Sequence, residues 1–210
     1  MRLLLAILAV FVFAAPQSVC ADIRHVDFRN FTFPWSGSQG GSSHLEWLDP
    51  EQENDVTLKD GRWELPDDDS DEGQKHPLFA GLTLEEVKYG QFTGGAREAA
   101  IVVLRFDSGG TQYSYYVYVY VFERNRPRLL AAFHSGDRSY FGLSRVYPSR
   151  GRLVVELFDP KHEEGDCCSD GIVRMTFRWR HGKFEGAGDR QFLKTDAPTR
   201  LPVSILGIHE

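Results

Sequence analysis

Residues 113–122 read Tyr-Ser-Tyr-Tyr-Val-Tyr-Val-Tyr-Val-Phe, an almost unbroken run of aromatic and β-branched side chains. Residues of this kind favour strands. Successive side chains of a strand point to opposite faces, so both faces of this strand are large and apolar. Such a strand needs cover on both sides. The run therefore predicts a central strand of a sheet that is buried on both faces.

Neighbouring segments predict further strands of the same sheet. Residues 99–106, 129–133 and 153–158 are short apolar runs, and turns are expected at 109–110, 125–127 and 181–183. In residues 173–180, apolar and basic or polar side chains alternate, which indicates a half-buried strand with a basic outer face. Short turns between successive strands imply an antiparallel meander. We therefore expect a mainly β, single-domain fold. A β-rich α+β fold is the variant, because one helix is conceivable in the 192–206 tail, interrupted by Pro198 and Pro202.

The first 21 residues have the layout of a secretory signal peptide. Met1 and Arg2 precede a continuous apolar run over residues 3–15, and small residues surround a cleavage point after Ala21. The run is shorter than the roughly 20 residues that span a bilayer. Lipidation at Cys20 is the alternative, but residues 17–19 fit a bacterial lipobox poorly. We expect a secreted or periplasmic, soluble protein without a membrane span.

The remaining chain divides into an N-terminal arm, a core and a tail. We expect residues 22–80 to form an irregular arm lying against the core, with a hairpin in which Val56 and Leu58 pair across Asp60-Gly61 with Trp63. Residues 81–190 form the β-rich core domain, and residues 191–210 form the tail. Residues 66–77 are acidic and are expected to be solvated. The formal charge of −6 argues against nucleic-acid binding, and we expect a monomer.

Cys167 and Cys168 are adjacent, and after cleavage they are the only cysteines left. Neighbouring Cα atoms lie about 3.8 Å apart across a trans peptide, whereas ordinary disulfides span about 4.4–6.8 Å. A bridge between them is therefore strained. We favour such a bridge, acting as a rigid turn before the next strand. The alternatives are a redox switch, inert thiols, or a metal site with His162 and Asp166, although this spacing is not a recognised zinc pattern. We expect no cofactor and no metal.

Three further groups of residues invite a functional interpretation. His134, Asp137 and Ser139 supply the residue types of a nucleophilic triad, but the chain has no Gly-x-Ser-x-Gly elbow. A loop in which Asp137 caps backbone amides or pairs with Arg138 is the simpler interpretation. Residues 67–72 resemble a calcium loop but lack its glycine and distal glutamate. On the basic outer face, Arg174, Arg178 and Arg180 suit an anionic partner or a solvated surface partly paired with acidic loops.

The chain resembles an uncharacterised family of exported bacterial proteins. The resemblance rests on residues 27–34 (Asp-Phe-Arg-Asn-Phe-Thr-Phe-Pro), 89–100 (Tyr-Gly-Gln-Phe-Thr-Gly-Gly-Ala-Arg-Glu-Ala-Ala), 109–111, 135–138 and 165–168 (Gly-Asp-Cys-Cys). It implies a shape and a compartment but no activity. The second segment is similar to the calcium loops of VCBS and FG-GAP repeats, but Gln91 and Gly95 replace its two aspartates. A tight turn therefore fits this segment better than a calcium site.

These observations predict a non-enzymatic module of the cell envelope that binds a small ligand or a protein partner. We expect Asp137, Arg138 and Asp166 to contribute to binding. No strong catalytic spacing is present. The alternative is a hydrolase or thiol-redox enzyme that uses the loops around Asp137 and Cys167-Cys168.

Overall fold

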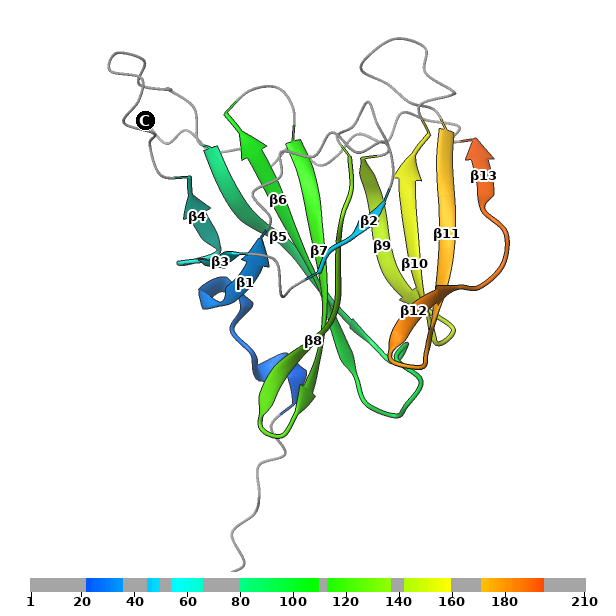
Figure 1. Cartoon of the computed structure of the whole chain (residues 1–210), viewed down its shortest axis with the longest axis horizontal. Coiled ribbons are helices and arrows are strands. Elements are labelled where there is room, and N and C mark those ends of the chain that lie inside the picture. Colours follow the sequence, from blue (N-terminus) through cyan, green and yellow to red (C-terminus); the bar gives the residue numbers. More distant parts are fainter. Residues whose placement is uncertain are drawn as a thin grey trace, which may run out of the picture.

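The computed structural model describes residues 22–35, 45–49, 54–65, 80–109, 113–136, 142–159 and 171–194. These residues form two short 3-10 helices, η1 (Ile23–His25) and η2 (Phe28–Asn30), and thirteen strands (Figure 1). The strands are β1 (Thr32–Trp35), β2 (Glu46–Trp47), β3 (Asn54–Thr57), β4 (Arg62–Glu64), β5 (Ala80–Gly90), β6 (Ala99–Ser108), β7 (Tyr113–Glu123), β8 (Arg126–His134), β9 (Leu143–Ser149), β10 (Arg152–Phe158), β11 (Gly171–Arg180), β12 (Lys183–Gly186) and β13 (Gln191–Lys194).

The strands form two large sheets and one small one. The six-stranded sheet has the order β2-β8-β7-β6-β5-β4, and the small sheet pairs β1 with β3. The second sheet has the order β12-β11-β10-β9, and β13 also pairs with β11. All pairings between named strands are antiparallel, and β5–β8 and β9–β12 are two successive meanders. The predicted mainly β, antiparallel fold is therefore confirmed.

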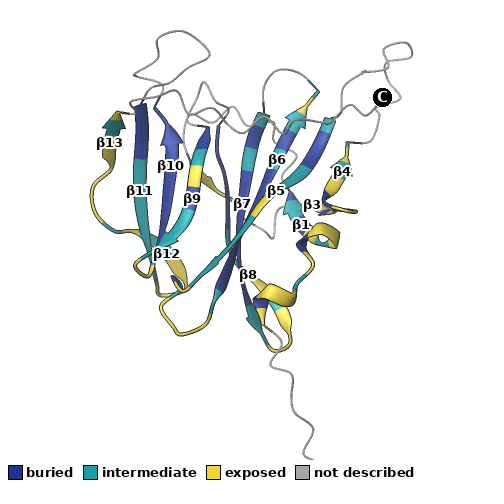
Figure 2. Cartoon of the chain, turned by 180° about the vertical axis from the view of Figure 1, so that it is seen from behind, coloured by how far each residue is buried: buried dark blue, intermediate teal, exposed yellow. Residues whose placement is uncertain are grey.

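The aromatic run lies at the centre of the six-stranded sheet, as predicted. Strand β7 is flanked by β6 and β8 and is buried along most of its length (Figure 2). Tyr116, Tyr118 and Tyr120 lie on one face of the sheet, and the valines at 117, 119 and 121 lie on the other, with the period of two that a strand imposes. One run of sequence thus supplies one face of each of two apolar cores.

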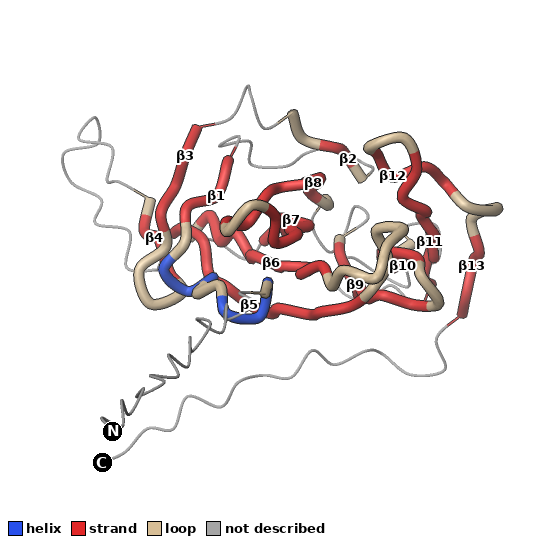
Figure 3. The backbone as a smooth tube through the Cα atoms, turned by 90° about the horizontal axis from the view of Figure 1, so that it is seen from below, coloured by secondary structure: helices blue, strands red, loops and turns tan. Residues whose placement is uncertain are grey.

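Two clusters of buried side chains cover the two faces of this sheet, which lies between the small sheet and the second sheet (Figure 3). The aromatic cluster joins the N-terminal segment to one face and includes Phe28, Phe33, Trp35, Tyr116, Tyr118 and Tyr120. The aliphatic cluster fills the space between the two large sheets and includes Ile101, Val103, Val117, Val119, Leu153, Val155 and Leu157. Residues 22–35 and 54–65 of the predicted arm are thus part of the packed structure.

The predicted hairpin between Val56 and Trp63 is wrong in its pairing. Asp60 and Gly61 do form a tight turn, with φ of 51° and 84°, and the Lys59 amide donates to the Arg62 carbonyl at 2.8 Å. Beyond the turn, however, the strands separate: Val56 lies opposite Phe33 in the small sheet, and Trp63 lies opposite Leu82. The Asp60-Gly61 turn determines where the chain reverses direction. It does not determine the pairing, because β3 before the turn pairs with β1 and β4 after the turn pairs with β5.

The C-terminal tail differs from the helix considered for residues 192–206. Residues Gln191–Lys194 form strand β13 on the edge of β11, and residues 195–210 lie outside the described residues. The open edge of β11 provides backbone partners that override a local helical pattern. Within the described ranges, no helix is long and apolar enough to cross a membrane.

Candidate functional site

The two predicted binding loops start and finish at one end of the molecule. Asp137, Arg138, Ser139, His162, Asp166, Cys167 and Cys168 themselves lie outside the described residues. The residues flanking them are held together by backbone contacts. Gly136 bridges Gly142, the Phe158 amide donates to the Gly142 carbonyl at 2.9 Å, and the Asp159 amide donates to the Gly171 carbonyl at 2.9 Å. The end of β8, the start of β9, the end of β10 and the start of β11, which flank the two loops in the chain, therefore lie together at the upper end in Figure 1.

A buried histidine lies beside this end. His134 is only 3% exposed, and its Nε2 lies 3.0 Å from Glu46 Oε2. Its Nδ1 has no hydrogen-bond partner in the described part of the chain. The carboxylate that meets His134 thus comes from β2, a two-residue strand paired with the end of β8. Glu46 could not be predicted from the sequence, because no pattern links it to His134, 88 positions away, through so short a strand.

Two other polar residues at this end are buried, and one of them supports the backbone. The Ser135 hydroxyl donates to the Gly136 carbonyl at 3.0 Å and accepts from the Leu143 amide at 3.1 Å. These two hydrogen bonds satisfy the Ser135 hydroxyl as donor and as acceptor, and neither involves the imidazole of His134. Asp159, at the end of β10, is almost fully buried. The Ser135 side chain therefore fixes the root of the segment between residues 136 and 142, and the backbone hydrogen bond from Asp159 to Gly171 joins the two flanks of the other segment.

Below this end, an apolar cleft of about 200 Å³ opens between the two large sheets. Its walls come from the segment around β2 on one side and from β10 and β11 on the other. The lining residues are Leu45, Trp47, Leu157, Val173, Met175, Phe177 and Arg190. The cleft is adjacent to the loop roots, because Glu46 and Trp47 pair with His134 and Phe133, and Val173 follows Gly171 by two residues.

Large apolar side chains are exposed around this cleft. Trp47 is 39% exposed although its ring packs against Phe133, Phe177 and Phe184 at 5.3, 5.5 and 5.9 Å between centroids. Phe192, which lies opposite Val173 on β13, is 62% exposed. Apolar walls with one cationic residue, Arg190, suit a ligand that has an apolar body and an anionic head. No sequence pattern predicts this cleft, since its two walls are far apart in the chain.

The segment similar to calcium loops is held by packing. Phe92 is fully buried in the aliphatic cluster, and Gly94 has a φ of 82°, which favours glycine. Gln91 and Gly95, at the two positions of the missing aspartates, are exposed. Among the described residues, no group of three or more His, Cys, Asp or Glu side chains is placed to hold a metal ion.

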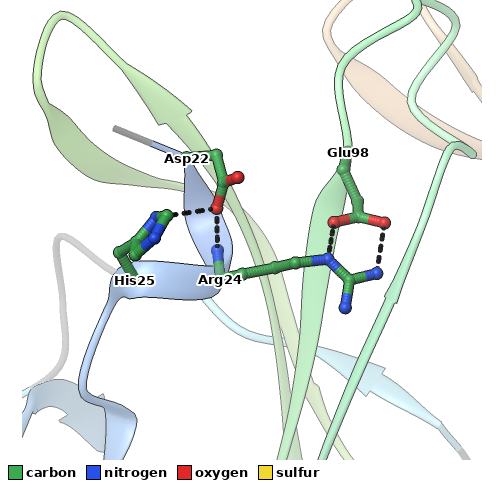
Figure 4. Close-up of polar contacts among 4 residues, drawn as sticks. All are labelled: Asp22, Arg24, His25 and Glu98. Carbon is green, nitrogen blue, oxygen red and sulfur yellow. Dashed lines mark hydrogen bonds and ion pairs between the residues drawn. The ribbon is translucent and has the colours of Figure 1, made fainter. Parts of the chain in front are cut away.

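An ion pair fastens the N-terminal segment to the end of this calcium-loop-like segment (Figure 4). Arg24 Nε and Nη2 donate to the two oxygens of Glu98 at 2.5 and 2.7 Å, a bidentate geometry. The hydrogen bond to Glu98 is the main reason that the pKa of Arg24 is raised. Asp22 accepts from the Arg24 amide at 2.7 Å and so orders the turn that carries the arginine.

The basic outer face predicted for residues 173–180 exists in the structure. Met175 and Phe177 pack against the aliphatic cluster, Val173 is buried, and Arg174, Thr176 and Arg178 alternate with these three. Two shallow grooves cross this outer face. One is lined by Arg178, Arg180 and Glu185, and the other by Arg150, Arg152 and Arg174 with their neighbours. The arginines at 150 and 152 were not recognised from the sequence, because the register that brings β9, β10 and β11 together is not visible there.

The fold is that of a mainly β protein with two large antiparallel sheets, a small third sheet, and an apolar cleft between the two large ones. Comparison with protein-family models, with curated proteins and with solved structures found no match to this chain.

Proposed function

We propose that this chain is an exported, soluble, non-enzymatic binding module of the cell envelope, and that it takes a small amphipathic ligand in the cleft between its sheets. The observation that carries the proposal is the cleft itself, with apolar walls and Arg190 among its lining residues. Export rests on the leader predicted over residues 1–21, and the resemblance to exported bacterial proteins supports the same compartment. We propose a monomer that binds no nucleic acid.

The exposed rings favour a binding role for the cleft. Interiors of proteins are normally close-packed, and exposed apolar surface that is contiguous with a hollow usually has a function. Trp47 contributes to the aliphatic side of the fold through Phe133 and Phe177, yet 39% of it remains exposed. An apolar ligand body in the cleft would cover this surface.

The predicted binding residues extend the proposal to the loops above the cleft. Asp137 and Arg138 directly follow Gly136, and Asp166 belongs to the segment that ends at Gly171. Both flanking glycines are at the end of the molecule where the cleft opens. We therefore propose that these three side chains contact the polar part of the ligand.

A titration with N-phenyl-1-naphthylamine, a neutral apolar fluorophore, tests the cleft. We expect saturable fluorescence enhancement with the full chain. Trp47→Ala should weaken the affinity about tenfold, because a ring wall of the cleft is removed. Trp179→Ala is the matched control: Trp179 is also a half-buried tryptophan, packed on Phe184, but it does not line the cleft. Equal affinities in both variants would exclude the cleft as the site.

The head group is tested separately by displacement of the fluorophore. Decanoate should displace it more effectively than decanol, and Arg190→Gln should remove that difference if Arg190 contacts the anionic head. Equal displacement by decanol and decanoate would indicate that the cleft binds a purely apolar ligand without an anionic head. Failure of both to displace the fluorophore would favour a protein partner over a small ligand.

The pair His134–Glu46 is the observation that favours the enzyme alternative, a hydrolase or a thiol-redox enzyme. A hydrolase should cleave p-nitrophenyl acetate and lose that activity in His134→Gln. A thiol-redox enzyme should reduce insulin disulfides with dithiothreitol and lose activity in Cys167→Ser. Absence of both activities in the full chain supports the binding module.

Mass spectrometry of the exported protein tests compartment and thiol state together. We expect a chain that begins at Asp22, with a mass two hydrogens below that of the fully reduced form. Two thiols that can be alkylated without prior reduction would contradict the proposed Cys167–Cys168 bridge.

A further inference from the structure

The outer face of the second sheet carries a basic groove that is separate from the cleft. Its volume is about 300 Å³, and it lies across strands β9, β10 and β11 and the start of β13. The lining residues are Tyr147, Ser149, Arg150, Arg152, Val154, Arg174, Thr176 and Gln191. Three of these are arginines, and none is a carboxylate. The whole chain, by contrast, has a formal charge of −6, so this concentration of positive charge is local.

Arg174 is held in place by a buried carboxylate. Its Nε and Nη2 donate to Glu156 Oε1 at 2.8 and 2.7 Å, and the side chain of Glu156 is only 5% exposed. A guanidinium carries five N–H donors. Because the side chain of Arg174 is 35% exposed, its remaining donors can reach a ligand. The carboxylate thus orients the arginine without covering it.

Tyr147 completes this arrangement from the neighbouring strand. Its hydroxyl donates to Glu156 Oε1 at 2.9 Å, and burial, with that hydrogen bond, raises the pKa of Tyr147 above its usual range. The phenol therefore keeps its proton at neutral pH. Glu156 accepts from both Tyr147 and Arg174, so one buried oxygen fixes two walls of the groove.

Arg150 and Arg152 are presented by a tight turn at the end of the groove. Arg150 and Gly151 have φ of 47° and 71°, the two left-handed residues of a two-residue hairpin turn. Arg152 lies opposite Ser149 and on the same face of β10 as Val154 and Glu156. Neither Arg150 nor Arg152 forms an ion pair within the described part of the chain. No carboxylate of the described ranges therefore neutralises the charge of Arg150 or Arg152.

We propose that this basic groove binds the phosphate group of a ligand, with Arg150, Arg152 and Arg174 as its charged contacts. Arginine forks match the geometry of phosphate oxygens and form charge-assisted hydrogen bonds with them. An anion between these three guanidinium groups also removes the repulsion among them. The phosphate belongs either to a free small molecule or to a phospholipid head group, since both present the same oxygens.

An NMR titration of the full chain with sodium pyrophosphate tests the site. We expect saturable shifts at Tyr147 and Thr176 that weaken as salt is raised. The double variant Arg150→Gln/Arg152→Gln should lower the affinity at least about tenfold. Arg124→Gln/Arg126→Gln is the matched control, because it removes two exposed arginines beside the corresponding turn of the β7–β8 hairpin. Circular dichroism and urea midpoints check that both variants fold.

Vesicles distinguish the two sources of phosphate. Co-sedimentation with phosphatidylglycerol vesicles but not with phosphatidylcholine vesicles, lost in Arg150→Gln/Arg152→Gln, assigns the groove to a lipid head group. Saturable pyrophosphate binding without co-sedimentation assigns it to a free phosphate ester. Binding in neither arm, or an equal loss in the matched control, overturns the proposal. Trp47→Ala should leave pyrophosphate binding unchanged, so this result is independent of the cleft.

Discussion

The two faces of the six-stranded sheet are built differently. On one face, the N-terminal segment closes over the tyrosines of β7 with its own aromatic rings, and Phe33 is completely buried between Phe31, Tyr118 and Tyr120. On the other face, the second sheet covers the valines of β7, but the two sheets leave the cleft open at their edge. The aromatic cluster is closed, whereas the aliphatic side remains open to a ligand.

This difference means that the two faces contribute unequally to stability. A closed face gains the full free energy of burying its rings. The open face gives up part of that free energy, because Trp47 and Phe192 stay exposed. We infer that the N-terminal side stabilises the central sheet and that the opposite side is the one available for ligands.

The largest effect is expected at the closed face. Phe33→Ala should lower the free energy of unfolding by about 3–5 kcal/mol, since it removes a fully buried ring and leaves a cavity among other rings. Urea denaturation followed by fluorescence measures this change. The control Phe192→Ala removes a ring that is 62% exposed and should change stability by no more than about 0.5 kcal/mol.

Truncation of a phenylalanine to alanine beside the cleft should lower the free energy of unfolding by less than Phe33→Ala does. Phe177→Ala, at a half-buried position that lines the cleft, should lower the free energy of unfolding by about 1–2 kcal/mol, because part of its surface already meets solvent. The two urea midpoints give the comparison directly. A loss as large as that of Phe33→Ala would mean that the two faces are packed equally tightly.

A hydrogen bond across the closed face provides a smaller effect. The Tyr118 hydroxyl donates to the Pro34 carbonyl at 2.7 Å and so ties β1 to the central strand. Tyr118→Phe should cost about 1 kcal/mol, measured by thermal or urea unfolding. Tyr120→Phe is the matched control, since its hydroxyl makes no hydrogen bond among the described residues. A loss of equal size in both variants would assign the effect to the rings instead.

The smallest effect concerns pH and is confined to the N-terminal segment. Hydrogen bonds from the Asn30 side chain and the Arg29 amide lower the pKa of Asp27. A carboxyl group whose pKa is lowered by folding stabilises the fold above its unfolded pKa of about 3.9 and loses that contribution as the pH falls toward the folded value. Asp27→Asn should therefore be less stable than the parent at pH 6.

Urea midpoints between pH 6 and pH 2.5 measure this dependence. The difference between Asp27→Asn and the parent chain should shrink below about pH 3.9. Asp189→Asn, at an exposed position, removes one carboxylate elsewhere in the chain and is measured beside Asp27→Asn as the control. A difference that stays constant with pH would show that the Asp27 charge does not contribute.

Regular alternation made part of this structure predictable. The central position of β7 follows from its two apolar faces, and the basic outer face of β11 follows from arginines at even-numbered positions, 174, 178 and 180, which share one face of a strand. The turn at His181 and Gly182 was also visible, and both residues have positive φ. In each case the information lies within one strand or one turn.

The remainder depends on contacts between distant segments. The pairing of β3 with β1, the approach of Glu46 to His134 and the walls of the cleft all join residues that carry no mutual signal in a single sequence. The groove around Arg150 and Arg152 needs the register of three strands. These features are decided by packing, which local propensity does not encode.

Along the edge that faces away from β10, strand β11 pairs with two strands of four residues each. These are β12 and β13, and residues 187–190 lie between them in the chain. The margin of the second sheet is therefore interrupted, and β2 and β4 likewise end the six-stranded sheet with two and three residues. A strand of another chain could form only a few consecutive backbone hydrogen bonds with edge strands this short. These three margins are thereby poor templates for edge-to-edge aggregation.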